Sequence, residues 1–252
     1  MSTLRTVRVP VLLAVIAVPL AIVVALVLFL LLPPIVAVLL GVLAGVAVAA
    51  WFYARAEHAV VGALRVVPVD DDSEPRLQNM IDGLCDSHGF RRPRLALIVD
   101  PALNAVVYGR SPAHVTLAVT TGLRDALTRM ELEGLLAREL ALATHDGLAG
   151  ATVLVPVLGV LPGGLRARVT RWFVGEHRAL LDDFGAVRFT RYPPGLAAAL
   201  DRMAAASTVV AGAGRASAHL WVVPPDQQNR AAVSPASDQP TIHERVDALR
   251  EL

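Results

Sequence analysis

The sequence contains no lysine and only one cysteine among its 252 residues. All 23 basic residues are arginine, which together with the abundance of alanine, valine, leucine and glycine is typical of a GC-rich bacterial genome rather than of a functional demand. The single cysteine, Cys85, excludes an intrachain disulfide and a cysteine-based zinc cluster. The net charge is only +1, so the bulk charge predicts no nucleic-acid partner.

Charged residues make up 18% of the chain and are absent from two long stretches near its N-terminus, Val9–Leu32 and Ile35–Ala54. As helices rising about 1.5 Å per residue, both can cross a hydrocarbon core about 30 Å thick. Pro33 and Pro34 leave almost no loop between them, which predicts a transmembrane helical hairpin. A cleaved signal peptide is the alternative, but its apolar core has only about 7–15 residues, so the anchor is favoured.

The charges that flank these stretches predict how the hairpin lies in the bilayer. Arg5 and Arg8 precede the first stretch and Arg55 follows the second. The positive-inside rule therefore places both ends, and the whole of the following domain, on the cytoplasmic side of the inner (cytoplasmic) membrane. Gly41 and Gly45, spaced four apart, would allow either close packing of the two helices or dimerisation, and packing is favoured.

Beyond a hairpin at residues 1–55, we expect a linker over 56–75 and one domain over 76–252. Apolar residues at helical spacing and short alternating runs predict an α+β fold, mainly helical with a small β-sheet. The apolar segment 147–165 is interrupted by proline and glycine and predicts core packing or a membrane-surface segment. Residues 206–240 are predicted to be rich in loops. The expected helices are 76–88, 123–143 with a break near Arg129, 171–189, 195–205 and 241–252, and the expected strands are 94–99, 104–108 and 115–120.

Residues 138–142 read Arg-Glu-Leu-Ala-Leu, a near match to the metallopeptidase pattern His-Glu-x-x-His. In that pattern the two histidines lie about 40° apart on a helix, so both can reach one zinc ion, and the glutamate activates the zinc-bound water. Here Glu139 is present, but neither histidine is, and no two of the seven histidines are spaced i, i+4.

Several further blocks follow one another along residues 75–252. They are Asn104-Ala105, Gly109-Arg110, His114, Ala118–Leu123, Glu131–Ala137, Arg188–Leu196, His219–Trp221 and Glu244–Leu249. In the order of these blocks and in its N-terminal hairpin, the chain resembles the HtpX-like membrane-bound zinc metallopeptidases, which are gluzincins.

The resemblance implies which residues stand at the family's site. Arg138 and Leu142 occupy the positions of the two histidine ligands, and Ala179 that of the third ligand, a glutamate. Glu139 keeps the general-base position and Asp183 that of the aspartate which orients the ligands. An arginine, a leucine and an alanine offer no lone pair to a metal, so zinc, expected for the family, is not expected here.

The resemblance and these losses together predict a catalytically inactive, membrane-anchored pseudopeptidase. Such a protein would bind unfolded or membrane polypeptides, or regulate an active protease, in membrane protein quality control. One binding route is strand addition at an edge strand formed by Val115, Thr116, Leu117, Ala118, Val119 and Thr120. The alternative is a strand packed inside the fold. We further expect Arg138 to pair with Asp183 or Glu139, putting a fixed positive charge where the family holds zinc.

Two other interpretations stay open. The first is an active zinc endopeptidase with a relocated metal site, built from His145, His177 and Glu176. The second is a structural membrane protein whose domain only packs against another protein.

Overall fold

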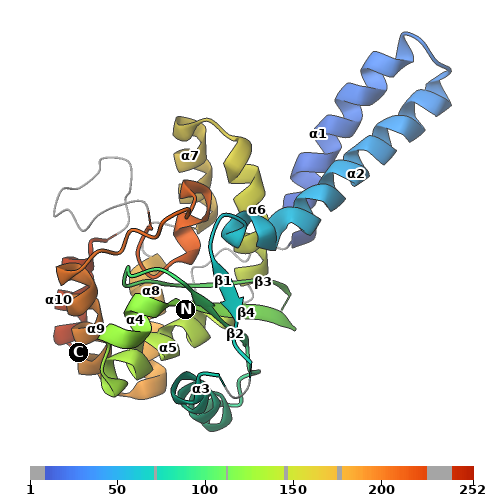
Figure 1. Cartoon of the computed structure of the whole chain (residues 1–252). Helices are drawn as coiled ribbons and strands as arrows, with labels where there is room; N and C mark the ends of the chain where they lie inside the picture. The colour runs from blue at the N-terminus through green and yellow to red at the C-terminus, as the bar shows by residue number, and fades with distance from the viewer. Residues whose placement is uncertain (1–8, 71–72, 112, 145–146, 175–177, 226–239) are drawn as a thin grey trace.

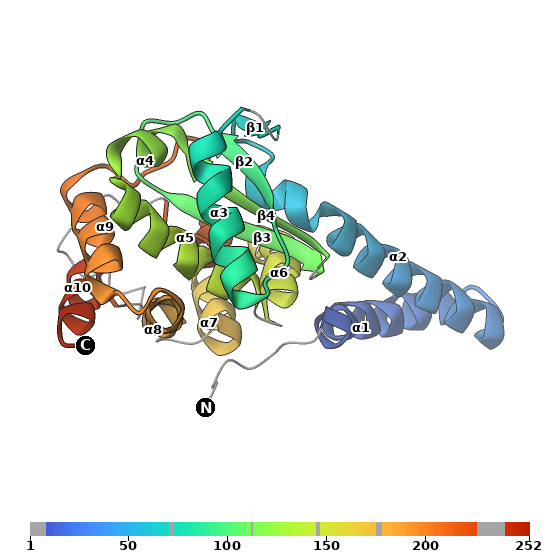
Figure 2. The same cartoon turned by 90° about the horizontal axis from the view of Figure 1, so that it is seen from below.

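The computed structural model describes residues 9–70, 73–111, 113–144, 147–174, 178–225 and 240–252. A helical hairpin projects from a mainly helical domain that contains a four-stranded sheet (Figures 1 and 2). The predicted fold class, α+β with a small sheet and an N-terminal apolar hairpin, is confirmed.

The hairpin consists of α1 (Val9–Phe29) and α2 (Pro34–Val61), both long and apolar enough to cross a membrane. The face of α2 that meets α1 carries a small residue at every fourth position. A side chain at Gly41 would place its Cβ 2.5 Å from the carbonyl oxygen of Ala21, and one at Gly45 would lie 2.5 Å from that of Ala17. The sequence allowed either close packing of the two helices or dimerisation at Gly41 and Gly45. The structure shows close packing within the hairpin. The small positions are Ala37, Gly41, Gly45 and Ala49.

The helix α2 does not stop at the predicted end of the span. It continues to Val61, and Ala56 and Val60 are buried against the domain. Strand β1 (Val66–Pro68) follows and pairs with the sheet. The expected linker over 56–75 is therefore wrong for its first half, because apolar contacts with the domain keep that segment helical.

The sheet has the strand order β1-β2-β4-β3 and is mixed. Strand β4 (His114–Thr120) runs parallel to β2 (Arg94–Ile98) and antiparallel to β3 (Ala105–Ser111). The predicted edge strand Val115–Thr120 is thus an internal strand with a hydrogen-bonded neighbour on each side, and the edge prediction is wrong. Sequence alternation identified the strand but could not identify its neighbours.

The helix α5 (Arg129–Ala143) is the central helix of the domain. A capping box between Thr128 and Glu131 starts it, and α4 (Thr121–Ala126) precedes the break that was predicted near Arg129. It packs against β3 and against two later helices, α8 (Arg178–Thr190) and α9 (Pro193–Ala205). Most of its residues are consequently buried.

The remaining elements complete the domain around α5. Helix α6 (Leu148–Val160) is buried between β3 and α2, so its apolar sequence serves core packing. Helix α10 (Ile242–Arg250) packs on α8 and α9 (Figure 1). The others are α3 (Pro75–His88), α7 (Gly163–Val174) and the 3-10 helix η1 (Arg215–Leu220).

We predict that Gly45→Leu destabilises the hairpin. The new side chain would meet the backbone of α1, which cannot move aside as a flexible side chain can. Overpacking of this kind costs about 1–3 kcal/mol. Unfolding of the full chain by sodium dodecyl sulfate in mixed micelles would measure it. The matched control is Val42→Leu, at an exposed position of the same helix, and equal stability of the two variants would contradict the packing described here.

Candidate functional site

Helix α5 carries two adjacent charged residues into the interior of the domain. The side chain of Arg138 is 2% exposed and that of Glu139 is 0% exposed. Taking a charge out of water costs several kcal/mol unless it is paired and hydrogen-bonded. The site is therefore defined by the groups that compensate these two charges.

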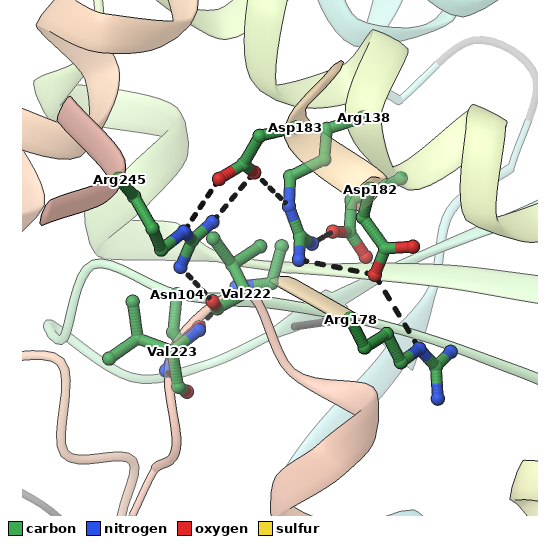
Figure 3. A network of polar contacts seen from close by, with 10 residues as sticks. Asn104, Arg138, Arg178, Asp182, Asp183, Val222, Val223 and Arg245 are labelled. Carbon is green, nitrogen blue, oxygen red and sulfur yellow. Dashed lines mark hydrogen bonds and ion pairs between the residues drawn. The ribbon is translucent and has the colours of Figure 1, made fainter. Parts of the chain in front are cut away.

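Helix α8 supplies most of the compensation for Arg138. The Nε of Arg138 donates to Oδ1 of Asp183 at 2.8 Å, and its Nη2 lies 3.5 Å from Oδ2 of Asp182 (Figure 3). Its Nη1 donates to Oε1 of Glu139. The guanidinium therefore meets three carboxylates, and the predicted pairing with Asp183 and Glu139 is confirmed.

Helix α10 contributes a second buried arginine, Arg245. Its Nε lies 2.7 Å from Oδ2 of Asp183 and its Nη2 lies 2.8 Å from Oδ1. Its Nη1 donates to the carbonyl oxygen of Val222 at 2.8 Å (Figure 3). Asp183 thus joins α5, α8 and α10 and, through Arg245, the segment that follows η1.

A third arginine completes the group. Arg178 lies one turn before Asp182 on α8, with its Nε 3.5 Å from Oδ2 of that carboxylate. We call the six side chains the buried ion cluster: Arg138, Glu139, Arg178, Asp182, Asp183 and Arg245. Three guanidinium groups face three carboxylates, so their formal charges balance.

The electrostatics of α5 follow from its burial. Burial raises the pKa of Glu139, while the charge of Arg138 acts in the opposite direction. Burial alone would lower the pKa of Arg138, but Glu139, Asp183 and Asp182 raise it above its ordinary value, so this group stays charged. The second oxygen of Glu139, Oε2, and the Nε of Arg178 have no hydrogen-bond partner among the described residues. Glu139 and Arg178 are therefore the incompletely satisfied members of the cluster.

A half-buried histidine lies beside the cluster. The Nε2 of His219 is 2.9 Å from the carbonyl oxygen of Ala151 in α6. Burial, together with the nearby charge of Arg178, lowers the pKa of His219 to about 4. This imidazole is neutral near pH 7 and connects η1 to α6.

The residues that the resemblance assigns to zinc do not fit a zinc ion. Leu142 is buried one turn after Arg138 on α5, and Ala179 is half-buried one turn before Asp183 on α8, a helix that packs on α5. Neither side chain has a donor atom, and Arg138 is engaged with carboxylates. Within the part of the chain that the structure describes, no group of three or more His, Cys, Asp or Glu side chains is arranged to hold a metal ion. His145, Glu176 and His177, proposed for a relocated site, lie outside the described residues.

Strand β4 and the outer side of β3 offer little room for an added peptide strand. Because β4 is internal, Val115–Thr120 cannot pair with a peptide. The outer side of β3 is also occupied: the amide of Val222 donates to the carbonyl oxygen of Ala105 at 3.0 Å, and the amide of Gly109 donates to Oγ1 of Thr152 at 3.1 Å.

Sequence reasoning identified Arg138, Glu139 and Asp183 but missed Arg178, Asp182 and Arg245. A signal for Arg245 was present, because it lies at i+3 from Ile242 and i−4 from Leu249, on the apolar face of the terminal helix. A charge on the buried face of an amphipathic helix indicates a buried partner. For Arg178 and Asp182 the signal was their i, i+4 spacing, which is also common on exposed helices.

Comparison with known proteins identifies a matching family and several similar proteins. The model of peptidase family M48 matches residues 71–168. A protease HtpX homolog of Dictyoglomus turgidum is 28% identical over 233 residues, covering 79% of this chain and 76% of the relative. A second, of Syntrophobacter fumaroxidans, is 26% identical over 242 residues, with 80% and 84% covered. A third, of Acidiphilium cryptum, is 36% identical over 143 residues, with 53% and 49% covered.

The fold and these matches define a membrane-associated protein of the M48 metallopeptidase class. Within that class, the chain belongs to the HtpX-like family.

We predict that Arg138→Met lowers the free energy of unfolding by about 3–5 kcal/mol, because it leaves buried carboxylates without a cation. Denaturant-induced unfolding in mild detergent measures this loss. The control is Arg92→Met, which removes an arginine that is 56% exposed and pairs with Asp82 and Asp86, and which should cost at most about 1 kcal/mol.

The loss should shrink as the pH falls. Removing the guanidinium raises the pKa of Glu139 further, so the folded variant holds a proton that the unfolded chain releases above the ordinary glutamate pKa. Stability of the variant relative to the wild type therefore rises with falling pH, while the contribution of His219 cancels in the difference. A loss that is independent of pH, or no larger than that of Arg92→Met, would contradict the assigned charge balance.

Proposed function

We propose that this protein is a pseudopeptidase: a membrane-anchored HtpX-like homologue that acts by binding or regulating protein partners and does not hydrolyse peptide bonds. The observation that carries the proposal is the arrangement of Arg138. A buried cation, hydrogen-bonded to Glu139 and Asp183, stands at the position that the resemblance assigns to the first zinc ligand.

The state of Glu139 supports the proposal. A general base must lie within hydrogen-bond reach of the proton that it removes, in practice of a reactive water. In a metallopeptidase that water is polarised by zinc. Here the carboxylate is fully buried, and one of its oxygens accepts from Arg138. Burial keeps this carboxylate from bulk water, and the contact with Arg138 occupies one of its two oxygens.

The charge balance supports it as well. A divalent cation beside Glu139, Asp182 and Asp183 would compete with three guanidinium groups that already neutralise these carboxylates. Arginine cannot release its proton in a protein, so lowering or raising the pH does not turn Arg138 into a ligand. The protein would bind zinc here only after arginine had been replaced.

We also propose the setting in which the protein works. The hairpin anchors it as a multi-pass protein of the inner membrane, and Arg5, Arg8 and Arg55 favour a cytoplasmic domain. The partners that fit this setting are unfolded or membrane polypeptides and an active protease of membrane protein quality control. Binding by strand addition at β4 is not part of this proposal, because that strand is internal.

Restoring the three zinc ligands by mutation tests whether these positions correspond to the family's zinc site. We predict that Arg138→His, Leu142→His and Ala179→Glu together give a full-length protein that binds one zinc ion per chain, because two histidines at i, i+4 and a glutamate from α8 complete a three-ligand set. Metal analysis of the purified protein, before and after dialysis against a chelator, measures it. The matched control keeps Leu142→His and Ala179→Glu but carries Arg138→Leu, which removes one ligand at similar burial. Equal zinc content in the two variants would contradict the assignment of these positions.

The wild-type protein provides the second arm of the test. We expect no stoichiometric zinc and no casein cleavage by the full chain. Stoichiometric zinc whose removal by a chelator also abolishes casein cleavage would overturn the proposal. It would instead support an active endopeptidase with a relocated metal site.

A further inference from the structure

The turn that joins α6 to α7 is exposed and carries no polar side chain. Its residues, 159–165, read Gly-Val-Leu-Pro-Gly-Gly-Leu, and we call them the apolar turn. Leu158 is the last buried residue of α6, and the exposed surface begins at the next residue. Val160 is 67% exposed and Leu165 is 48% exposed. A single exposed apolar residue is ordinary on a protein surface, but a whole turn without a polar side chain indicates a contact with something apolar.

Several backbone groups at the apolar turn have partners within the protein. The guanidinium of Arg166, directly after the turn, donates to the carbonyl oxygens of Leu158 and Leu161 at 2.9 and 3.0 Å. The amide of Arg166 donates to the carbonyl oxygen of Pro162 at 2.9 Å, and Pro162 itself has no amide hydrogen. Lipid chains offer no hydrogen bonds, so a segment that meets them needs such internal partners. The turn therefore suits an apolar environment in its backbone as well as in its side chains.

The apolar turn begins next to the base of the hairpin. A second, smaller apolar cluster, apart from the main core, joins Leu158 to Leu12 in the first turn of α1 and to Ala56 on α2, just beyond its apolar stretch. The turn starts one residue after Leu158, and it lies on the side of the domain from which the hairpin projects (Figure 1). It is therefore held at the level where both helices of the hairpin leave the domain.

The neighbouring surface of the hairpin is itself apolar. Val11 and Val15, one turn apart at the start of α1, are 56% and 60% exposed. The helix that carries them is long and apolar enough to cross a membrane. The apolar turn therefore continues a surface that fits hydrocarbon. A bilayer matches both the composition of the turn and its place beside the hairpin, whereas a protein partner would match its composition alone.

We propose that the apolar turn dips into the leaflet at the base of the hairpin, where Val160 and Leu165 contact the hydrocarbon of the lipid chains. Arg166 limits the depth, because its charged guanidinium is bonded to carbonyl oxygens at the turn and is costly to bring into hydrocarbon. The two helices of the hairpin and the turn then give the protein three points of membrane contact. This contact is independent of whether the domain hydrolyses peptides.

The test uses the full chain in nanodiscs of phosphatidylcholine, with and without phosphatidylglycerol. Cys85 is buried, so a thiol introduced by Gly164→Cys can be labelled selectively with a fluorophore. A Cβ at Gly164 meets no atom within 4 Å, so the turn accommodates the new side chain. Lipid that carries a spin label on its acyl chain quenches the fluorophore where the two are in contact. The reference is Gly83→Cys, a position with equally open space on α3, on the far side of the domain from the hairpin (Figures 1 and 2).

We expect strong quenching at position 164 and little at the reference position in both membranes, because the contact is apolar. Moving a valine or leucine side chain from water into an apolar environment favours the contact by roughly tenfold or more. Val160→Asp with Leu165→Asp should therefore weaken it by roughly 100-fold or more and reduce quenching at position 164 to the reference level. The matched control, Met130→Asp with Leu252→Asp, changes two residues that are 52% and 67% exposed elsewhere on the domain, and it should leave the quenching unchanged.

Three results would overturn the proposal. They are absence of quenching at position 164 in both membranes, quenching that appears only with phosphatidylglycerol, and quenching that survives Val160→Asp with Leu165→Asp. The first would indicate a protein partner on the turn, and the second a contact made by charged groups. The third would mean that the hairpin alone holds the turn near lipid, without binding by its apolar side chains.

Discussion

The structure depends on neutralising charge in a dry interior. Arg138 and Asp183 are almost completely buried, so neither can rely on water, and each is stable only because the other elements bring it a partner. Asp183 receives donors from α5 and α10, and Arg245 returns to the carbonyl oxygen of Val222. Three helices and the segment beside β3 therefore have to assemble together. Moving any one of them would leave a buried charge uncompensated.

The same constraint bears on chemistry. A hydrolytic metal centre needs a cation with an open position and a base that can reach water. The guanidinium of Arg138 supplies positive charge without an open position, and it occupies the carboxylate that would be the base. The balance of three arginines against three carboxylates gives the domain a metal-independent way to hold α5 against α8. The fold is stabilised when Arg138 pairs with the buried carboxylates, whereas hydrolysis by a metal centre would need a metal ligand at this position. Replacing Arg138 should therefore lower stability while it removes an obstacle to metal binding.

Local patterns predicted the elements of this fold, and long-range contacts decided the rest. The hairpin, the strand 94–98 and the break before Arg129 were all predictable because they depend on charge-free length, alternation and capping within a few residues. Whether Val115–Thr120 lies at an edge depends instead on which strands pair with it, and a period of two contains no such information. In the site, Arg138 and Asp183 were found through the resemblance. Arg178 and Asp182 were missed because their i, i+4 spacing is equally compatible with a solvated helix.

The anchor and the domain are parts of one continuous body, and this shapes how the protein can act. Helix α2 runs without interruption from the apolar span to Val61, with Ala56 in the smaller apolar cluster and Val60 in the main core. A flexible tether would let the domain sample many orientations above the bilayer, whereas a shared helix packed into two clusters holds one. The faces turned toward the membrane are therefore set by the fold. A protein that works by binding partners at a membrane gains from such an arrangement, because no ordering of a linker opposes the encounter.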